Sequence, residues 1–139
     1  MASETEDSKV LLRRITEEIW TGGRLDLIDQ LIAEDFIDHI EIPGLEATGP
    51  ERYRASVEAI RGAFPDYHEE ILWSIGEDDV AVSFALLTGT NSGPFYGMEP
   101  TGKKVEYHAM GALRFRSGQA VERWGIGDSL VIMQQLGLF

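Results

Sequence analysis

The sequence of 139 residues contains no cysteine. This absence excludes a disulfide framework, a thiolate nucleophile and a metal site with cysteine ligands. Long apolar runs are also absent, since the longest, such as Val80–Leu87, are far too short to cross a bilayer. The N-terminus lacks the charged-then-apolar pattern of a signal peptide. We therefore expect a cytoplasmic protein that does not contact membranes.

Basic residues are scarce, and only three of the 12 are lysines, against 24 acidic residues and a net charge of -12. This balance makes nucleic acid an unlikely partner, because phosphates require a basic surface. It also disfavours strongly anionic substrates unless a local arginine compensates, so the charge favours a nearly neutral small molecule. A well-solvated acidic surface is the simpler interpretation of the same composition.

Several signatures of catalytic and metal sites are missing. No two of the three histidines have metal-ligand spacing, and the carboxylates are too scattered to define a site, so we predict no metal. The glycine-rich stretch Thr88–Gly97 joins two expected strands rather than a strand to a helix, so it does not cradle a phosphate. It is either a lid that carries Phe95, Tyr96 and Met98 or an ordinary hairpin connection.

Helical periodicity dominates the first half, after a tail at residues 1–7 that we expect to fray. Ser8 can cap a helix that ends at Gly22, and a capping box of Thr48 and Glu51 begins another that ends at Pro65. Between them lie a short helix and a short strand, predicted over Asp26–Ile32 and Phe36–Ile42.

Strand periodicity dominates the second half, which closes with a short helix. The pattern predicts one α+β domain over residues 8–139, with N-terminal helices on one face of a curved, largely antiparallel sheet. The strands are expected over Glu69–Ile75, Val80–Thr90, Val105–Arg116 and Gln119–Gly127, and the last helix over Ser129–Leu136.

The inward face of the sheet is predicted to hold a pocket. Odd positions of Val105–Arg116 are apolar and include the small residues Ala109 and Gly111, which leave space for a ligand. On the next strand Trp124, Ile126 and Asp128 share one face. Because Trp124 is unfavourable in water, we expect that face to point inward and to bring Asp128 to the pocket rim.

Asp128 is the leading acid/base candidate, because partial desolvation would raise its pKa toward the range useful for proton transfer. It can equally be the cap of the helix that follows. His39 could polarise a carbonyl, or simply pair with Asp38, whereas His108 falls on the more polar sheet face.

The strand Val80–Thr90 is apolar on both faces and therefore needs two partners. One is the helix layer. The other is expected to be a second copy of the chain, so the pattern predicts a homodimer through the outer sheet face.

From Ile19 to Gly137 the sequence resembles the SnoaL-like polyketide cyclases, within the nuclear-transport-factor-2-like fold. The segments that carry the resemblance are IWTGGRLDLIDQLIAEDFIDH (Ile19–His39), FPD (Phe64–Asp66), TGT (Thr88–Thr90), EPTGKKVEY (Glu99–Tyr107), LRF (Leu113–Phe115) and ERWGIGDSLVIMQQLG (Glu122–Gly137).

This resemblance implies a cone-shaped α+β barrel that is usually dimeric and works without a cofactor. It assigns the acid/base role of an intramolecular aldol closure to Asp128 and the family's histidine to His39. Two departures are Asn91, where relatives often have histidine, and Gly111, where they often have an acid. The residues expected to bind the ligand are Trp20, Tyr53, Phe64, Asn91, Tyr107 and Trp124.

The first hypothesis is therefore a cofactor-independent cyclase or lyase that acts on an apolar or polycyclic ketone. The second is a non-catalytic ligand-binding or dimerisation module of the same fold. Isomerisation or hydrolysis, a third, requires a second inward acid that the sequence pattern does not identify.

Overall fold

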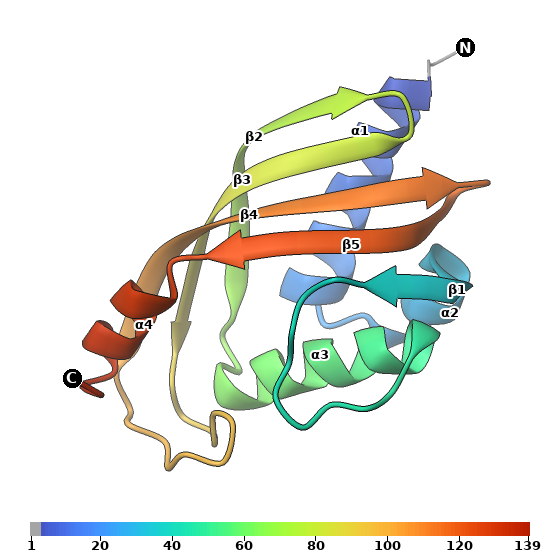
Figure 1. Ribbon diagram of the computed structural model, residues 1–139. Helices are drawn as coiled ribbons and strands as arrows, with labels where there is room; N and C mark the ends of the chain where they lie inside the picture. Colours follow the sequence, from blue (N-terminus) through green and yellow to red (C-terminus); the bar gives the residue numbers. More distant parts are fainter. Residues whose placement is uncertain (1–3) are drawn as a thin grey trace.

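The computed structural model describes residues 4–139, where one sheet of five strands lies over a layer of helices (Figure 1). This arrangement confirms the predicted α+β class. The elements are α1 (Glu4–Arg14), the π-helix η1 (Ile15–Thr21), the 3-10 helix η2 (Leu25–Leu27), α2 (Ile28–Leu31), β1 (Ile32–Asp38), α3 (Gly49–Ala63), β2 (His68–Glu77), β3 (Val80–Thr90), β4 (Lys104–Arg116), β5 (Gln119–Gly127) and α4 (Ser129–Gln135).

The first helix begins earlier than its sequence pattern predicts. Residues 1–3 of the expected tail lie outside the described residues, and α1 is already helical at Glu4. Ser8 does not cap it. Its side chain is buried, and its hydroxyl donates to the carbonyl oxygen of Asp78 over 3.5 Å.

The capping box predicted for α3 is also not formed. Thr48 occupies the N-cap position, but its side chain makes no capping hydrogen bond. The helix begins instead at Gly49, which has a φ of 60° that favours glycine, followed by Pro50 in the first turn.

The sheet has the order β1-β5-β4-β3-β2, with antiparallel pairs except for the parallel pair of β1 and β5. β1 begins four residues before the predicted strand because Ile32, Ala33 and Phe36 are the residues that become buried. The chain after His39 forms a loop. Arg52 stabilises this loop by donating hydrogen bonds to the carbonyl oxygens of Ile40 (2.8 Å) and Leu45 (3.2 Å).

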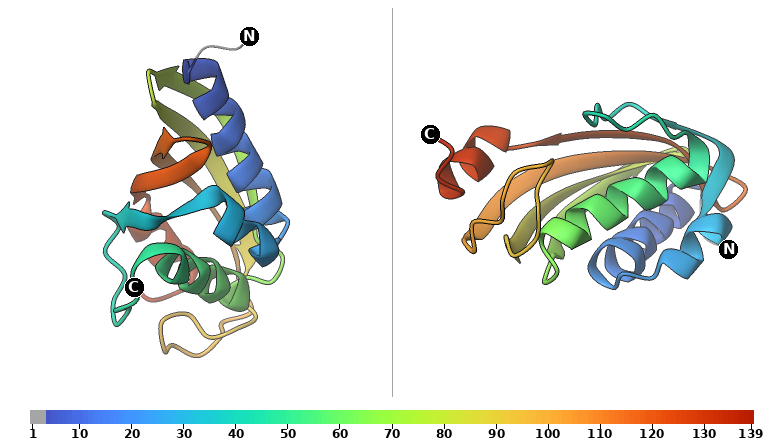
Figure 2. Two further views of the ribbon diagram at one scale, coloured as in Figure 1. Left: turned by 90° about the vertical axis from the view of Figure 1, so that its right-hand side faces the viewer. Right: turned by 90° about the horizontal axis from the view of Figure 1, so that it is seen from below.

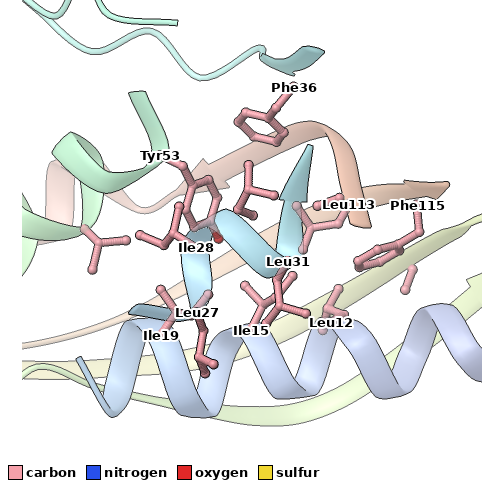
Figure 3. Close-up of a cluster of buried hydrophobic side chains, with 14 residues drawn as sticks. Leu12, Ile15, Ile19, Leu27, Ile28, Leu31, Phe36, Tyr53, Leu113 and Phe115 are labelled. Atoms are coloured by element: carbon pink, nitrogen blue, oxygen red, sulfur yellow. The ribbon is translucent and has the colours of Figure 1, made fainter. Parts of the chain in front are cut away.

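The sheet curves over α1, α2 and α3, which lie on its concave side, whereas α4 lies at the end of β5 (right view of Figure 2). Two clusters of buried side chains fill this space. The larger one joins α1, η1, α2, β1, α3 and β4 (Figure 3) and includes Leu12, Ile15, Ile28, Tyr53, Leu113 and Phe115. The smaller cluster centres on Phe64, Tyr67, Leu87 and Val105.

The inward face of β4 is the odd-numbered one, as predicted, but the expected face of β5 is wrong. Leu113 and Gly111 pair with Arg123 and Gly125, so these β5 residues face inward. A register shift between Arg114 and Phe115 accompanies this arrangement. The sequence pattern failed here because a buried arginine is rare.

The loop between β3 and β4 is fastened to the end of α3 by Asn91, which is 1% exposed. Its side-chain nitrogen donates to the carbonyl oxygens of Ala63 and Gly93, and its side-chain oxygen accepts from the backbone and hydroxyl of Thr101. A Cβ atom at Gly93 would overlap the carbonyl oxygen of Gly62. Only glycine therefore fits this close approach.

We predict that Gly93→Ala destabilises the protein by about 1–3 kcal/mol, because the backbone must move to relieve the overlap. Gly62→Ala is the matched control, since a Cβ there meets nothing within 4 Å. Urea unfolding of both variants measures the difference. Equal stability of the two variants would contradict the close packing of this loop.

Candidate active site

A cavity of about 350 Å³ lies between the concave sheet face and the helices. This is the lower end of the range for small-molecule pockets, roughly 300–1,000 Å³. Its walls are mainly apolar, and small residues on β4 and β5 create the space. Residues that border it include Ile15, Ile60, Leu87, Ala109, Gly111 and Gly125.

The cavity is bordered at one side by the segments that follow β1, β3 and β5. Ile40 and Glu41 come from the loop after β1, Phe95 and Tyr96 from the loop after β3, and Ser129 from α4. The Phe95 ring packs edge-on against Phe64, with centroids 5.5 Å apart. Phe95 and Tyr96 of the glycine-rich loop thus border the cavity, whereas Met98, the third residue expected there, does not.

An ion-pair network lies beside the cavity at the junction of β1, β5 and α3. The Asp38 side chain is fully buried and accepts from Arg123 through Nε (3.1 Å) and Nη2 (2.7 Å). It also accepts from Arg52 Nε (3.3 Å) and from the backbone N–H of Ile40 (3.0 Å). One carboxylate is therefore shared by two guanidinium groups.

Arg123 links this network to the cavity, which it borders while only 8% exposed. Its guanidinium carbon lies 5.0 Å from the Tyr53 ring centroid and 5.4 Å from that of Trp20. Trp20 Nε1 donates to the Tyr53 hydroxyl over 2.6 Å. Stacking and hydrogen bonding fix the orientation of all three side chains.

Glu69, near the start of β2, is a carboxylate that borders the cavity, as is Glu41 from the loop after β1. The Tyr67 hydroxyl donates to its Oε1 over 2.6 Å, and the Glu69 backbone N–H donates to the Thr21 hydroxyl over 3.0 Å. Burial raises the pKa of Glu69, and this effect exceeds the lowering by Tyr67 and Arg123. The raised pKa makes this carboxyl a stronger base than an ordinary glutamate and thus a better candidate for proton transfer.

Tyrosine hydroxyls are among the other polar groups around the cavity. Burial raises the pKa of Tyr53 to about 12, and burial together with the Glu69 charge raises the pKa values of Tyr67 and Tyr107. These hydroxyls remain protonated at neutral pH and can donate hydrogen bonds to a ligand oxygen.

The structure brings three of the expected ligand-binding residues to the cavity, namely Trp20, Tyr53 and Tyr107. Two others have structural roles. Phe64 is 3% exposed in the smaller core cluster, and Asn91 fastens the loop after β3. Trp124 borders the cavity, but its ring lies on the outer face and stacks on His39 with centroids 5.0 Å apart.

Asp128 does not have the expected inward orientation. It is exposed at the end of β5, and its Oδ1 accepts from the backbone N–H of Val131 over 3.4 Å as the N-cap of α4. Its neighbours Gly127 and Ser129 border the cavity, whereas Asp128 does not. Its position agrees with the alternative prediction that Asp128 caps the helix that follows it.

His39 is also outside the cavity. Its Nε2 lies 2.6 Å from Glu122 Oε2, and its side chain is 42% exposed. The predicted pairing with Asp38 does not occur because Asp38 points inward to Arg52 and Arg123. His108 is exposed on the outer face, as predicted, and stacks on Phe84 with centroids 5.1 Å apart.

Sequence reasoning missed Arg123 and Glu69, two of the charged residues that border the cavity. The strand pattern placed Arg123 outside because it precedes Trp124, and Glu69 stands beside Glu70 in a segment that looks solvated. The available signal was the pair Tyr67 and Glu69, which share a strand face with Ile71.

Among the described residues no group of three His, Asp or Glu side chains could hold a metal ion. Within the same part of the chain, every helix is too short or too polar to cross a membrane. The acidic and phenolic groups that border the cavity are Glu41, Glu69 and the tyrosine hydroxyls.

Several solved structures have the same fold. IdmH from Streptomyces antibioticus, described as a candidate polyketide cyclase, is 25% identical over 94% of this chain and 98% of that chain, with a TM-score of 0.80. AclR from Streptomyces galilaeus, described as a candidate hydroxylase, is 25% identical over 97% of this chain and 83% of that chain, with a TM-score of 0.82. A SnoaL-like protein from Jannaschia sp. CCS1 is 23% identical over 98% of this chain and 95% of that chain, with a TM-score of 0.87.

No functionally curated protein matches the sequence. The sequence profile of the SnoaL-like polyketide cyclases, in contrast, matches residues 10–136, nearly the whole chain. The curved sheet over N-terminal helices agrees with that profile and with the solved structures. The chain therefore belongs to the SnoaL-like polyketide cyclase family and has the nuclear-transport-factor-2-like fold.

Proposed function

We propose that this protein is a cofactor-independent cyclase that closes a ring by aldol chemistry on an apolar or polycyclic ketone. The observation that supports the proposal most strongly is a carboxylate with a raised pKa, Glu69, at the wall of an otherwise apolar cavity. Family membership favours the same class of reaction.

In the proposed reaction ionised Glu69 removes a proton from the carbon beside a ligand carbonyl, which leaves an enolate. The enolate carbon then bonds to a second carbonyl carbon of the same molecule, and the resulting alkoxide takes the proton back from Glu69. Protons and electrons balance without an oxidant or reductant. Tyr67 donates to Glu69 Oε1 and holds the carboxylate in place.

Glu69 replaces Asp128 in this proposal because of where the two carboxylates lie. Asp128 is exposed and its side chain caps α4, so it has the solvation of an ordinary surface acid. Glu69 is desolvated at the cavity, which favours proton exchange with a bound ligand. His39 has no role in the proposal, since it stacks on Trp124 at the outer face.

Glu69 is also the inward acid that the isomerase and hydrolase alternatives require, so isomerisation through the same enolate is a second candidate function. It would differ in the final step, where Glu69 returns the proton to another carbon. Product structure separates the two: a new carbon–carbon bond indicates cyclisation. A binding module would form no product.

The first enolisation step can be tested with 2-tetralone, an apolar bicyclic ketone. We predict that the protein accelerates exchange of its α-protons in deuterated water, measured by proton NMR. Glu69→Gln should lower the accelerated rate on the order of 10²–10⁴-fold, the usual contribution of a positioned general base.

Asp128→Asn is the matched control in this assay and should retain the wild-type exchange rate. If Asp128→Asn abolishes exchange while Glu69→Gln retains it, the rim carboxylate is the base and the assignment to Glu69 is wrong. Absence of exchange in the wild type would favour the binding module.

A raised pKa of Glu69 also predicts how stability depends on pH. The folded state holds the proton more tightly than the unfolded state, whose pKa is near 4.5. Glu69 therefore removes stability as the pH rises from that value through its folded pKa. Glu69→Gln should match the wild type at lower pH and exceed it at neutral pH in urea unfolding.

The exposed neighbour Glu70 provides the control for this measurement. Glu70→Gln should show no comparable growth of the stability difference with pH. A constant difference between Glu69→Gln and the wild type at every pH would contradict the raised pKa.

We also propose that the outer sheet face joins two copies of the chain. Trp73 (46% exposed), Met110 (42%) and Ile126 (81%) form a continuous apolar surface on this face together with Phe84 and Ile75. In a dimer with a two-fold axis, this surface on one copy packs against the same surface on the other copy. An exposed apolar surface of this kind is unusual for a monomer.

Ile126→Asp should convert the dimer to a monomer in light scattering coupled to size-exclusion chromatography. The side chain contacts little within one copy, so the fold should remain intact. Val10→Asp, which adds the same charge at a 65% exposed position on α1, should remain dimeric. A monomeric wild type would refute the interface.

A further inference from the structure

We infer that Arg123, together with the Tyr53 hydroxyl, binds the oxygen that becomes negatively charged when the ligand is enolised. The inference rests on the proposed function, because that oxygen arises in the enolisation step. It gives a role to a cation at the cavity, opposite in sign to Glu69, and so defines the ligand as a ketone or enol whose oxygen points toward β5.

The charge balance around Arg123 supports this role. Asp38 is the carboxylate that pairs with both Arg123 and Arg52, so two positive charges face one negative charge within this network. Arg52 also donates hydrogen bonds to the carbonyl oxygens of Ile40 and Leu45, and it does not border the cavity. Arg123 is the member of the network that borders the cavity.

The geometry of Arg123 is fixed before a ligand enters. Asp38 holds Nε and Nη2, and the Trp20 and Tyr53 rings flank the guanidinium. The Tyr53 side chain also interacts with the guanidinium and raises the pKa of Arg123. Preorganised donors of this kind stabilise a developing oxyanion most effectively in a desolvated site.

The two charged groups complement each other in the reaction. Glu69 must be ionised to accept the proton, and proton transfer then moves the negative charge from Glu69 to the enolate oxygen, where a nearby cation stabilises it. Arg123 lies close enough to Glu69 to lower its pKa. It therefore stabilises the reactive form of Glu69 before proton transfer and the enolate afterwards.

The chain has a net charge of -12, so the positive charge of Arg123 at the cavity contrasts with the acidic protein around it. An acidic surface disfavours anionic ligands, and Arg123 offsets this repulsion only near the ligand oxygen that becomes negatively charged. The expected ligand is neutral in solution and acquires its charge only when bound. Simple carboxylic acids are disfavoured because Glu69 would repel them.

The test uses 2-naphthol, a flat enol whose ionised form absorbs at a distinct wavelength, and naphthalene, which has the same rings without the oxygen. In the wild type, 2-naphthol should bind more tightly than naphthalene in isothermal titration calorimetry. Arg123→Met should weaken 2-naphthol binding on the order of tenfold to a hundredfold, the usual loss for one hydrogen bond to a charged group. Naphthalene binding should change little.

Spectroscopy of bound 2-naphthol separates a charge effect from a structural one. At fixed pH the ionised fraction should fall about tenfold in Arg123→Met and rise in Glu69→Gln, because the variants remove charges of opposite sign. The other titratable groups around the cavity, Tyr53, Tyr67, Tyr96, Tyr107 and Glu41, are the same in all three proteins.

Arg123→Met keeps Asp38 paired with Arg52, which favours folding. Arg123→Lys retains the charge and should lie between the wild type and Arg123→Met. Equal losses for 2-naphthol and naphthalene, an unchanged ionised fraction, or no binding of 2-naphthol by the wild type would overturn the inference. None of these outcomes alters the 2-tetralone comparison of Glu69→Gln with Asp128→Asn, so the two proposals fail independently.

Discussion

The buried carboxylate of Asp38 connects the parts of the protein that form the cavity. It binds Arg123 from β5 and Arg52 from α3, and its own strand, β1, is the edge strand that pairs parallel with β5. Removing one partner of a buried ion pair usually costs about 3–5 kcal/mol. This network therefore fixes the sheet edge, the helix beneath it and the loop after β1 in one arrangement.

The same network explains why the cavity is polar at selected points and apolar elsewhere. Arg123 can be buried only because Asp38 neutralises part of its charge and aromatic rings flank it. Small residues on β4 and β5 leave the space that Arg123 and Glu69 border. Burial raises the pKa of Glu69, and Arg123 of the network partly opposes that shift.

Much of the architecture followed from sequence periodicity. The bounds of β3 and β5 agree with their predicted ranges, and the odd-numbered face of β4 is inward as expected. These segments are long and alternate clearly, so local pattern and burial agree. Family resemblance identified the fold correctly.

The site was less predictable because its key groups depend on tertiary contacts. Alternation on β5 favoured Trp124 as inward, but the buried charge of Asp38 requires Arg123 there instead. Glu69 looked like one of two solvated acids until Tyr67 and the curvature of β2 brought it to the cavity. Asp128 matched the family pattern, and the structure shows it as the helix cap that the sequence had left open as the alternative.

The central claim is that the carboxylate tuned for proton transfer is Glu69 inside the cavity. A carbon-13 NMR titration of the side-chain carboxyl groups, with Glu69 assigned by the loss of its signal in Glu69→Gln, tests this claim most directly. The account predicts that Glu69 titrates above the ordinary value for glutamate. A Glu69 carboxyl that titrates at or below that value would contradict it.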